Sequence, residues 1–413
     1  MTSTKKIAVI GAGVTGVTTA YKLLQKGAEV TLFEANPHAA METSYANGGQ
    51  LSASNAEVWN NPATLLKGVK WMFTAGAPLL MNFRPSWHKY SWLAEFVAAV
   101  PHYEQNTVQT VKWAIEARTH LLDMAATENI AFDRESTGIL HFYGNHADFD
   151  AARKVTEILR KGGLDRREVT HSEIAQIEPS LKGPLVGGFY TDSDFTGDIN
   201  KFTKGLAAAC VAQGATFRYS APVDRLVPQG DEVEVVFGQA GTTATERQQF
   251  DQVVICAGVH SRRLAEMVGD RVNIYPVKGY SITVNLEGAD NQAAAPRTSL
   301  LDDNAKIVTS RLGDDRFRVA GTAEINGANK DIVWKRIAPL LEWCRERFPE
   351  MSTESVVPWA GLRPMMPNML PRVGPGKHPG VFYNTGHGHL GWTLSGVTAE
   401  IVAHSMISER SAA

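Results

Sequence analysis

The stretch from Lys6 to Glu34 constrains the fold of this 413-residue chain more than any other part of it. Residues 6–10 form a short, mostly apolar run that predicts a buried strand, and residues 11–16, Gly-Ala-Gly-Val-Thr-Gly, follow directly. Apolar side chains then recur at helical spacing, and residues 28–33 alternate as a second strand does. A Gly-x-Gly-x-x-Gly motif in this setting, with an acidic residue ending the second strand, predicts a dinucleotide-binding βαβ unit.

Each glycine of the motif has a separate physical task. Gly11 permits the tight turn, Gly13 lets the backbone approach a pyrophosphate, and Gly16 lets the helix pack against the strand. Val14 and Thr15 begin the helix, whose unpaired N–H groups and positive dipole end attract phosphate. We therefore expect these five residues to contact the cofactor.

Glu34 indicates which dinucleotide the unit takes. Its carboxylate accepts hydrogen bonds from ribose hydroxyls, and an acidic side chain there argues against the 2′-phosphate of NADP. The alternative is a glycine-rich turn that binds nothing, which isolated glycines would favour. Here strand, helix, second strand and Glu34 all fall in register, so we interpret the segment as dinucleotide-binding.

Composition and charge exclude several functional classes. The formal net charge is -2, so the chain has no basic footprint for nucleic acid. Cys210, Cys256 and Cys344 are far apart and support neither a disulfide framework nor a zinc site, so we expect no metal. No stretch reaches the ~18 consecutive apolar residues of a membrane span, which predicts a cytoplasmic protein.

A polar loop with two adjacent glycines follows the second predicted strand. It is either an ordinary solvent loop or a loop laid against the cofactor, where glycines let the backbone contact a flat ring. In the second interpretation the contacting residues are Ser44, Asn47, Gly48, Gly49, Gln50 and Leu51.

Residues 58–103 are rich in both aromatic and cationic side chains. One interpretation is a helical lid packed on the core. The other is an interfacial segment, because Trp with Lys or Arg suits the headgroup zone of a bilayer. The residues concerned are Trp59, Trp71, Phe73, Phe83, Trp87, Tyr90, Trp92, Phe96 and Tyr103, with Lys67, Lys70, Arg84 and Lys89.

The rest of the chain predicts two kinds of sheet. Residues 250–257 form an almost wholly apolar run, typical of a strand covered on both faces, and Gly258 then predicts a second nucleotide-facing turn. Alternating segments between residues 272 and 355 predict an antiparallel sheet with one open face. A strand at residues 381–384 leads through several glycines into a final helix.

Five motifs are distributed along nearly the whole chain, at residues 9–16, 43–52, 276–281, 361–365 and 384–393. Together with Glu34 they resemble the FAD-dependent amine and amino-acid oxidoreductases of the D-amino acid oxidase superfamily. More narrowly, they are similar to the small, flavin-bearing subunit of bacterial D-amino acid dehydrogenases. The glycine fingerprint occurs in many flavoproteins, whereas the second and last motifs are far more specific.

This resemblance implies an α/β fold with two domains. A doubly wound, Rossmann-type FAD-binding domain would consist of residues 1–57, 185–270 and 356–413. An inserted substrate domain, built on an antiparallel sheet, would consist of residues 58–184 and 271–355. The strand patterns described above agree with this division.

The resemblance also implies chemistry. Such enzymes move the α-hydrogen and two electrons of an amino acid to the flavin, and the imine then hydrolyses to a 2-oxo acid and ammonia. Arg363, in a Gly-x-Arg-Pro context, resembles the family's carboxylate-binding arginine, and a structural salt bridge is its alternative role. Tyr280 is a second catalytic candidate, with core packing as its alternative.

The glycine-rich segment before the last helix would place N–H groups beside the flavin's pyrimidine edge, where reduced flavin is negatively charged. The further cofactor contacts that we expect are Val223, Ala257, Gly258, Gly386, His387, Gly388, His389, Leu390, Gly391, Trp392 and Thr393. No residue matches the attachment motifs of covalent flavoproteins, so the FAD is expected to be non-covalent.

The resemblance further implies a quinone or other electron carrier as acceptor, reached through peripheral contact with the inner face of the plasma membrane. One alternative function is a dehydrogenase or oxidase of secondary amines, glycine, D-proline or hydroxyproline. A second is an FAD subunit that only relays electrons.

Overall fold

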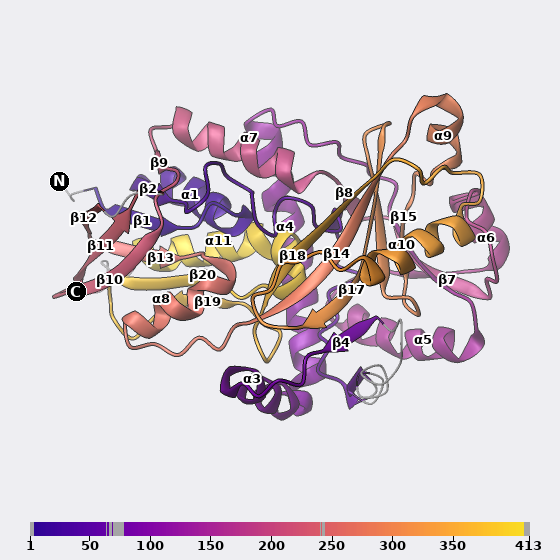
Figure 1. Ribbon diagram of the computed structural model, residues 1–413, viewed down its shortest axis with the longest axis horizontal. Helices are drawn as coiled ribbons and strands as arrows, with labels where there is room; N and C mark the ends of the chain where they lie inside the picture. The colour runs from indigo at the N-terminus through magenta and orange to yellow at the C-terminus, as the bar shows by residue number, and fades with distance from the viewer. Residues whose placement is uncertain are drawn as a thin grey trace.

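The computed structural model describes residues 4–62, 64–65, 68, 78–239, 241 and 244–408. Two large sheets organise it, and both chain termini lie at the end that carries the six-stranded sheet (Figure 1). The helices are α1 (Val14–Gln25), α3 (Trp87–Ala98), α4 (Tyr103–Thr127), α5 (His146–Lys161), α6 (His171–Ile177), α7 (Ile199–Ala212), α8 (Ser261–Met267), α9 (Gly288–Ala294), α10 (Trp334–Arg347) and α11 (Gly391–Ser408).

The six-stranded sheet has the order β19-β20-β13-β1-β2-β9. Neighbouring strands are parallel, except that β19 pairs antiparallel with β20. The predicted strands near both ends of the chain and near residue 254 therefore lie side by side. The strands are β1 (Lys6–Ile10), β2 (Glu29–Phe33), β9 (Thr216–Arg218), β13 (Gln252–Ile255), β19 (Arg372–Pro375) and β20 (Val381–Thr385).

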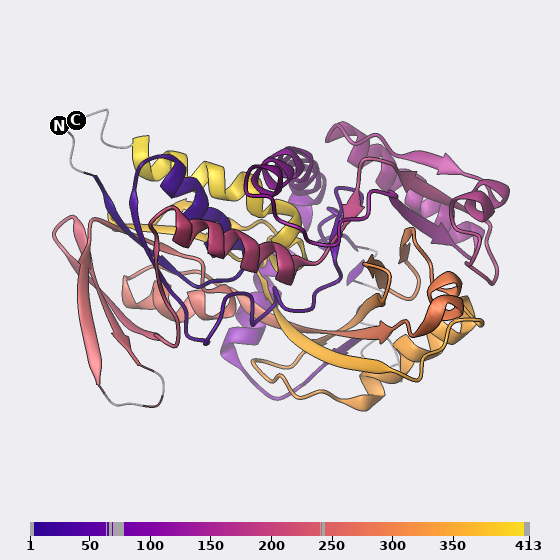
Figure 2. The same cartoon turned by 90° about the horizontal axis from the view of Figure 1, so that it is seen from above.

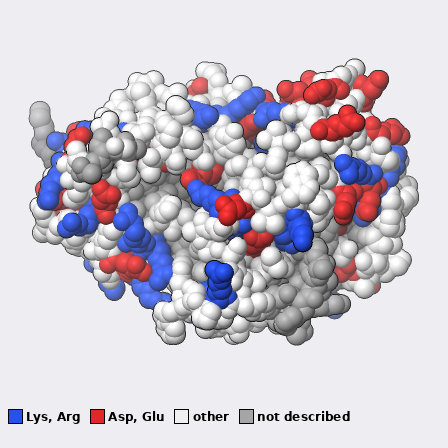
Figure 3. Space-filling view, viewed as in Figure 1, with Lys and Arg blue, Asp and Glu red and all other residues white. Residues whose placement is uncertain are grey.

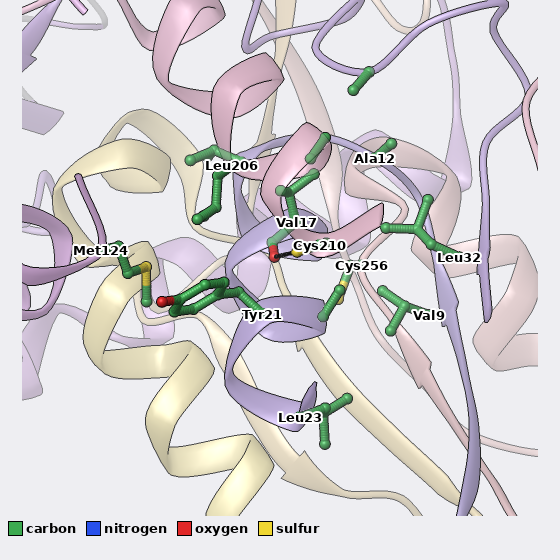
Figure 4. Packing of buried hydrophobic residues seen from close by; sticks show 14 of the residues in the cluster. Val9, Ala12, Val17, Tyr21, Leu23, Leu32, Met124, Leu206, Cys210 and Cys256 are labelled. Atoms are coloured by element: carbon green, nitrogen blue, oxygen red, sulfur yellow. Dashed lines mark hydrogen bonds between the residues drawn. The ribbon is translucent and has the colours of Figure 1, made fainter. Parts of the chain in front are cut away.

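Both faces of this sheet are covered, which explains its nearly continuous apolar strands. Ile7 and Val9 pack toward α1, α7 and α11, whereas Ala8 and Ile10 pack toward α8 and a three-stranded sheet. That smaller sheet consists of β10 (Val223–Gln229), β11 (Glu232–Gly238) and β12 (Thr245–Phe250). Figure 2 shows the three helices together on one face, and Figure 4 shows Val17 of α1 and Leu206 of α7 in the same buried cluster as Val9 and Leu32 of the sheet.

The second sheet has nine strands along the path β18-β14-β17-β16-β15-β5-β7-β6, with β4 paired to β17. Its pairs are antiparallel apart from β5 with β15 and β4 with β17. Helix α10 covers one face through Ile337 and Leu340. The strands are β4 (Leu79–Met81), β5 (Ile139–Tyr143), β6 (Arg167–Val169), β7 (Gly187–Thr191), β14 (Tyr275–Asn285), β15 (Ser299–Asp302), β16 (Ile307–Leu312), β17 (Arg316–Ile325) and β18 (Val356–Met365). A separate short pair joins β3 (Gln50–Leu51) and β8 (Phe195–Thr196).

Strand pairing corrects two of the expected domain boundaries. The expected division placed β7 and β18 with the nucleotide-binding pieces, but both belong to the nine-stranded sheet. Strand β18 pairs with β14 from Tyr275↔Met365 to Val284↔Val356. Composition did not reveal this, because a strand's partner is set by register with a distant segment.

The described part of residues 58–103 combines buried and exposed aromatic side chains. Trp92 is 3% exposed and donates its indole N–H to the carbonyl of Met365, whereas Trp87 is 84% exposed. The ammonium of Lys89 is buried and donates to the carbonyls of Asn82 and Arg84. Lys67, Lys70, Trp71 and Phe73 lie outside the described residues. Helix α3 is thus packed as a lid on one side and open to solvent on the other.

None of the described helices has both the length and the apolar character that a bilayer span requires. The face shown in Figure 3 carries both signs of charge, with acidic side chains gathered toward the end where α9 lies. This face therefore presents no continuous basic surface.

Candidate active site

The turn between β1 and α1 depends on its glycines. Gly11 has a φ of +106°, a conformation that favours glycine, and a Cβ there would lie 2.8 Å from the carbonyl oxygen of Cys256. A Cβ on Gly16 would lie 1.8 Å from the carbonyl oxygen of Gly11. The helix therefore packs directly on the turn, as the motif predicts, and its N-terminus at Val14 is aimed at the same place.

Glu34 and Ser44 complete the turn. The Glu34 carboxylate accepts hydrogen bonds from the backbone N–H of Ala12 at 2.7 Å and of Asn36 at 2.8 Å. The Ser44 hydroxyl accepts one from the N–H of Val14 at 3.0 Å. These contacts place a carboxylate and a hydroxyl beside the N-terminus of α1, where a dinucleotide needs partners for its ribose and phosphates.

The loop after Ser44 is fixed to the second sheet by three consecutive carbonyl groups. Ser281 donates to the carbonyl of Ala46, Arg318 to that of Asn47, and Ser310 to that of Gly48, at 2.7 to 3.1 Å. A Cβ on Gly48 would lie 2.7 Å from Val308, and one on Gly49 would lie 2.8 Å from Ser310. Close packing on β16 is thus a reason for the glycine pair that the sequence interpretation did not include.

A cavity of about 680 Å³ joins the glycine turn to this loop and to the second sheet. Two predicted residues do not line it. The side chain of Leu51 is buried in the cluster between the six-stranded sheet and its helices, and Gly16 instead allows α1 to pack on the glycine turn. The predicted residues that line it are Gly11, Gly13, Val14, Thr15, Glu34, Ser44, Asn47, Gly48, Gly49, Gln50, Val223, Ala257, Gly258, Tyr280, Arg363, Gly386, His387, Gly388, His389, Leu390, Gly391, Trp392 and Thr393.

Arg363 has an unusual environment for a cation. Its guanidinium lies over Gly279 of the neighbouring strand, where a Cβ would approach to 2.4 Å of Cζ. Within the part of the chain that the structure describes, it has no hydrogen bond or ion pair, and burial lowers its pKa to about 10. A desolvated cation without a protein partner, facing a cavity, is suited to bind an anion. A structural salt bridge, the alternative role, is absent among these residues.

Tyr280 follows Gly279 on β14, so its side chain leaves the opposite face of the sheet. Its hydroxyl donates to Glu324 Oε1 at 3.0 Å, and the ring packs in the cluster under α10. Glu324 also receives the ammonium of Lys278 at 2.9 Å. This geometry supports the packing role for Tyr280, and we leave its hydroxyl out of the site.

His387 and His389 are neutral near pH 7. Burial lowers the pKa of each to about 3, and for His389 the charge of Arg363 adds to the effect. His387 Nε2 lies 3.0 Å from the Thr398 hydroxyl, and the His389 ring stacks on Trp59 with 4.7 Å between centroids. Both rings therefore form walls of the cavity and are poorly suited to act as general bases.

Five further cavity residues were missed by the sequence interpretation as site residues. They are Glu57, Trp59, Asp303, Lys306 and Trp359. The indole of Trp359 lies over Gly361, where a Cβ would approach to 2.1 Å. The sequence signal for Trp359 was the glycines at 279 and 361. They are paired on adjacent strands, and without side chains of their own they leave space for a large neighbouring side chain. Nothing in local spacing marked the other four.

Comparisons with known proteins agree with this arrangement. D-amino acid dehydrogenase 3 of Mesorhizobium japonicum is 59% identical over 96% of each chain, and D-amino acid dehydrogenase of Paramagnetospirillum magneticum is 40% identical over 99% of this chain and 96% of its own. Glycine oxidase from Geobacillus kaustophilus has a similar fold, with a TM-score of 0.76, 20% identity, and coverage of 98% and 95%.

A family model described as FAD dependent oxidoreductase, DAO, matches residues 6–405. The α/β architecture and the glycine turn are those that such a family requires. The chain belongs to the DAO family of FAD-dependent oxidoreductases.

Proposed function

We propose that this protein oxidises D-amino acids to 2-oxo acids and ammonia and passes the electrons to a quinone or another carrier. The observation that carries the proposal is the guanidinium of Arg363, which has no partner among the described residues and faces the cavity that begins at the dinucleotide turn. The names of the two relatives, matched over nearly their whole length, support the substrate class.

Arg363 would bind the substrate carboxylate through two parallel N–H···O hydrogen bonds. No protein partner among the described residues has to be displaced, so the cation is ready for the anion. The glycine at 279 lets the guanidinium lie close to the sheet, and Trp359 stands four residues before Arg363 on the same face of β18. This arrangement would fix the position of Cα relative to the carboxylate.

The cavity residues fit FAD, which when bound would accept a hydrogen and two electrons from the substrate. The turn, Glu34 and Ser44 would hold the adenosine ribose and the pyrophosphate. Gln50 Oε1 and Trp392 Nε1 are buried without a hydrogen-bond partner among the described residues, so an acceptor and a donor remain for a polar ring. The N–H groups before α11 add further donors.

We propose non-covalent binding of this FAD. Cys256 lines the cavity, but burial raises the pKa of its thiol to about 12, so it is a poor nucleophile near neutral pH. Neutral His387 and His389 are also unsuited to take a proton from an ammonium group. The substrate amine would therefore enter unprotonated, and the chain needs no side-chain base.

The segment that includes β4 and α3 would connect the cavity to the electron acceptor. Pro78 and Leu79 line the cavity, while the following residues Leu80, Phe83, Trp87 and Tyr90 are all exposed. Exposed aromatic side chains of this kind suit the headgroup level of a bilayer. We infer peripheral contact with the inner face of the plasma membrane, where a quinone would be available.

A substrate panel with an artificial dye as acceptor tests the function. We expect D-amino acids to be oxidised and their L-enantiomers to be inactive, with ammonia released in proportion to dye reduced. Preferred turnover of glycine, sarcosine or D-proline would indicate the secondary-amine alternative. Failure of every amine, together with electron transfer from a reduced partner, would indicate the relay alternative.

A further inference from the structure

The carboxylate of Glu57 lines the same cavity, and only one of its two oxygens accepts hydrogen bonds from described residues. Its Oε1 accepts hydrogen bonds from the Tyr103 hydroxyl at 2.6 Å and from Asn61 Nδ2 at 3.1 Å. Its Oε2 has neither a hydrogen bond nor an ion pair with any residue that the structure describes. Burial raises the pKa of Glu57, and the carboxylate of Asp303 acts in the same direction. A desolvated carboxylate oxygen of this kind favours a cationic partner.

The other charged groups around Glu57 already have partners. Asp303 receives the ammonium of Lys306 at 2.9 Å on one oxygen and the Tyr143 hydroxyl at 2.6 Å on the other. Burial by itself would raise the pKa of Asp303, but Lys306 and further donors hold it well below its usual range. Arg166 donates to Thr156 and packs over Phe189.

His141 adds no charge in this region, because burial lowers its pKa to about 4. The charges of Asp303 and Lys306 cancel in their ion pair. The positive charge of Arg166 lowers the pKa of Glu57, but the two side chains form no hydrogen bond or ion pair with each other. Among the described residues, Glu57 Oε2 therefore remains open to a cation in this part of the cavity.

Glu57 and the carboxylate anchor Arg363 both line this cavity. Trp59, two residues along the chain, stacks on His389, and His389 feels the charge of Arg363. Leu79, Val308 and Ala320 add apolar lining. Among the described residues, the cavity thus offers a cation without a partner at Arg363 and a carboxylate with one free oxygen at Glu57, with apolar surface for a methylene chain.

We propose that Glu57 Oε2 binds the cationic end of the substrate side chain, so that basic D-amino acids such as D-lysine and D-arginine are preferred substrates. This inference rests on the proposed function, because it takes the substrate carboxylate to be held by Arg363. The bound side chain would complete the hydrogen bonding of Glu57 with a charge-assisted contact.

Binding to the FAD-loaded wild-type protein tests the inference without any substitution. The ligand 6-aminohexanoate has the carbon chain and terminal ammonium of lysine but no α-amine, and hexanoate lacks the ammonium. We expect calorimetry to show 6-aminohexanoate binding roughly 10- to 100-fold more tightly, as one charge-assisted contact predicts. Equal affinities, or tighter binding of hexanoate, would overturn the inference.

Glu57→Gln tests the residue. In the dye assay, kcat/KM for D-lysine should fall roughly 10- to 100-fold, while kcat/KM for the neutral D-norleucine should stay within about threefold. Tyr103→Phe is the matched control, because it removes a hydrogen bond to the same carboxylate but keeps the charge, and it should retain the preference for D-lysine. Glu57→Asp keeps the charge and should retain part of that preference.

Equal losses for both substrates in Glu57→Gln would mean that Glu57 contacts the α-amine or supports the fold, and the inference would be wrong. Unchanged kinetics with both substrates would also overturn it. Turnover of D-norleucine by the wild-type protein keeps the two proposals separate. If D-norleucine is oxidised and D-lysine has no advantage, only this inference fails; if neither is oxidised, the proposed function fails.

Discussion

Arg363 makes the sharpest prediction, because its removal should affect stability and activity in opposite directions. Burial lowers its pKa from 12.5 to about 10. At about 1.4 kcal/mol per pKa unit, this corresponds to a cost of roughly 3 kcal/mol for keeping the charge in the folded protein. Because the folded pKa lies below the unfolded one, the cost applies at every pH below about 10, including pH 7.

Arg363→Met keeps most of the side-chain volume and removes the charge. In the absence of substrate, we expect this variant to be as stable as the wild type or more stable, by up to about 3 kcal/mol. Without the anchor, kcat/KM should fall by about 2–4 kcal/mol, roughly 30- to 1000-fold. Arg363→Ala should lose activity similarly, and Arg363→Lys should also be impaired because it lacks the bidentate fork.

Urea unfolding of the FAD-loaded proteins and steady-state kinetics with a dye acceptor measure the two effects, with flavin absorbance as the check on cofactor content. Gly279→Ala is the matched control for position, since its Cβ would displace the guanidinium without removing it. Wild-type kinetics in Arg363→Met would exclude the residue from the site. A large loss of stability would show that it serves a structural ion pair.

Three further predictions concern the cofactor, the histidines and the membrane. Gly16→Ala places a Cβ 1.8 Å from the Gly11 carbonyl oxygen, so the purified variant should be colourless, whereas the wild type should be yellow and release its flavin on acid precipitation; a variant with full flavin absorbance would contradict the role assigned to this glycine. His389 has a pKa of about 3 in the folded protein, below its ordinary 6.5, so stability should fall as pH drops from 6.5 toward 4, by about 1.4 kcal/mol per pH unit from this residue. His389→Gln should show a smaller slope in urea unfolding across that range, and identical slopes would mean that the ring takes up a proton. Phe83→Ala with Trp87→Ala should weaken salt-sensitive sedimentation with anionic vesicles, and turnover should be slow with oxygen and fast with a quinone analogue. Trp92 is buried and is not a suitable site for that test; full-rate release of hydrogen peroxide would identify an oxidase.

Local sequence determined the elements whose causes are local. The turn at Gly11 needs a positive φ, and Gly16 needs the absence of a Cβ, so the motif and its strand and helix could be read directly. Residues 170–173, Thr-His-Ser-Glu, have the spacing of a capping box, and that capping box is present at the start of α6. The apolar run before Gly258 predicted a strand covered on both faces, and β13 is fully buried.

The active-site assignments depended on contacts that no local pattern contains. Arg363 and Tyr280 were both candidates, but pairing of β14 with β18 places the arginine over Gly279 and leaves the tyrosine on the other face. Pairing with β14 also places Val356–Met365 in the second sheet and not in the FAD-binding domain where we expected it. A local pattern does not predict this, because the partner strand lies some eighty residues away along the chain.

Glu57 shows most clearly which site residues a sequence pattern cannot predict. Its residue type and its neighbours along the chain give no signal, and its significance comes from one oxygen inside a cavity that has no partner among the described residues. Residue types along the chain established where it could turn and which segments were apolar, because those properties depend on φ and on side-chain chemistry alone. Only the tertiary structure decided which charged groups are paired, because pairing depends on distances between side chains that folding brings together.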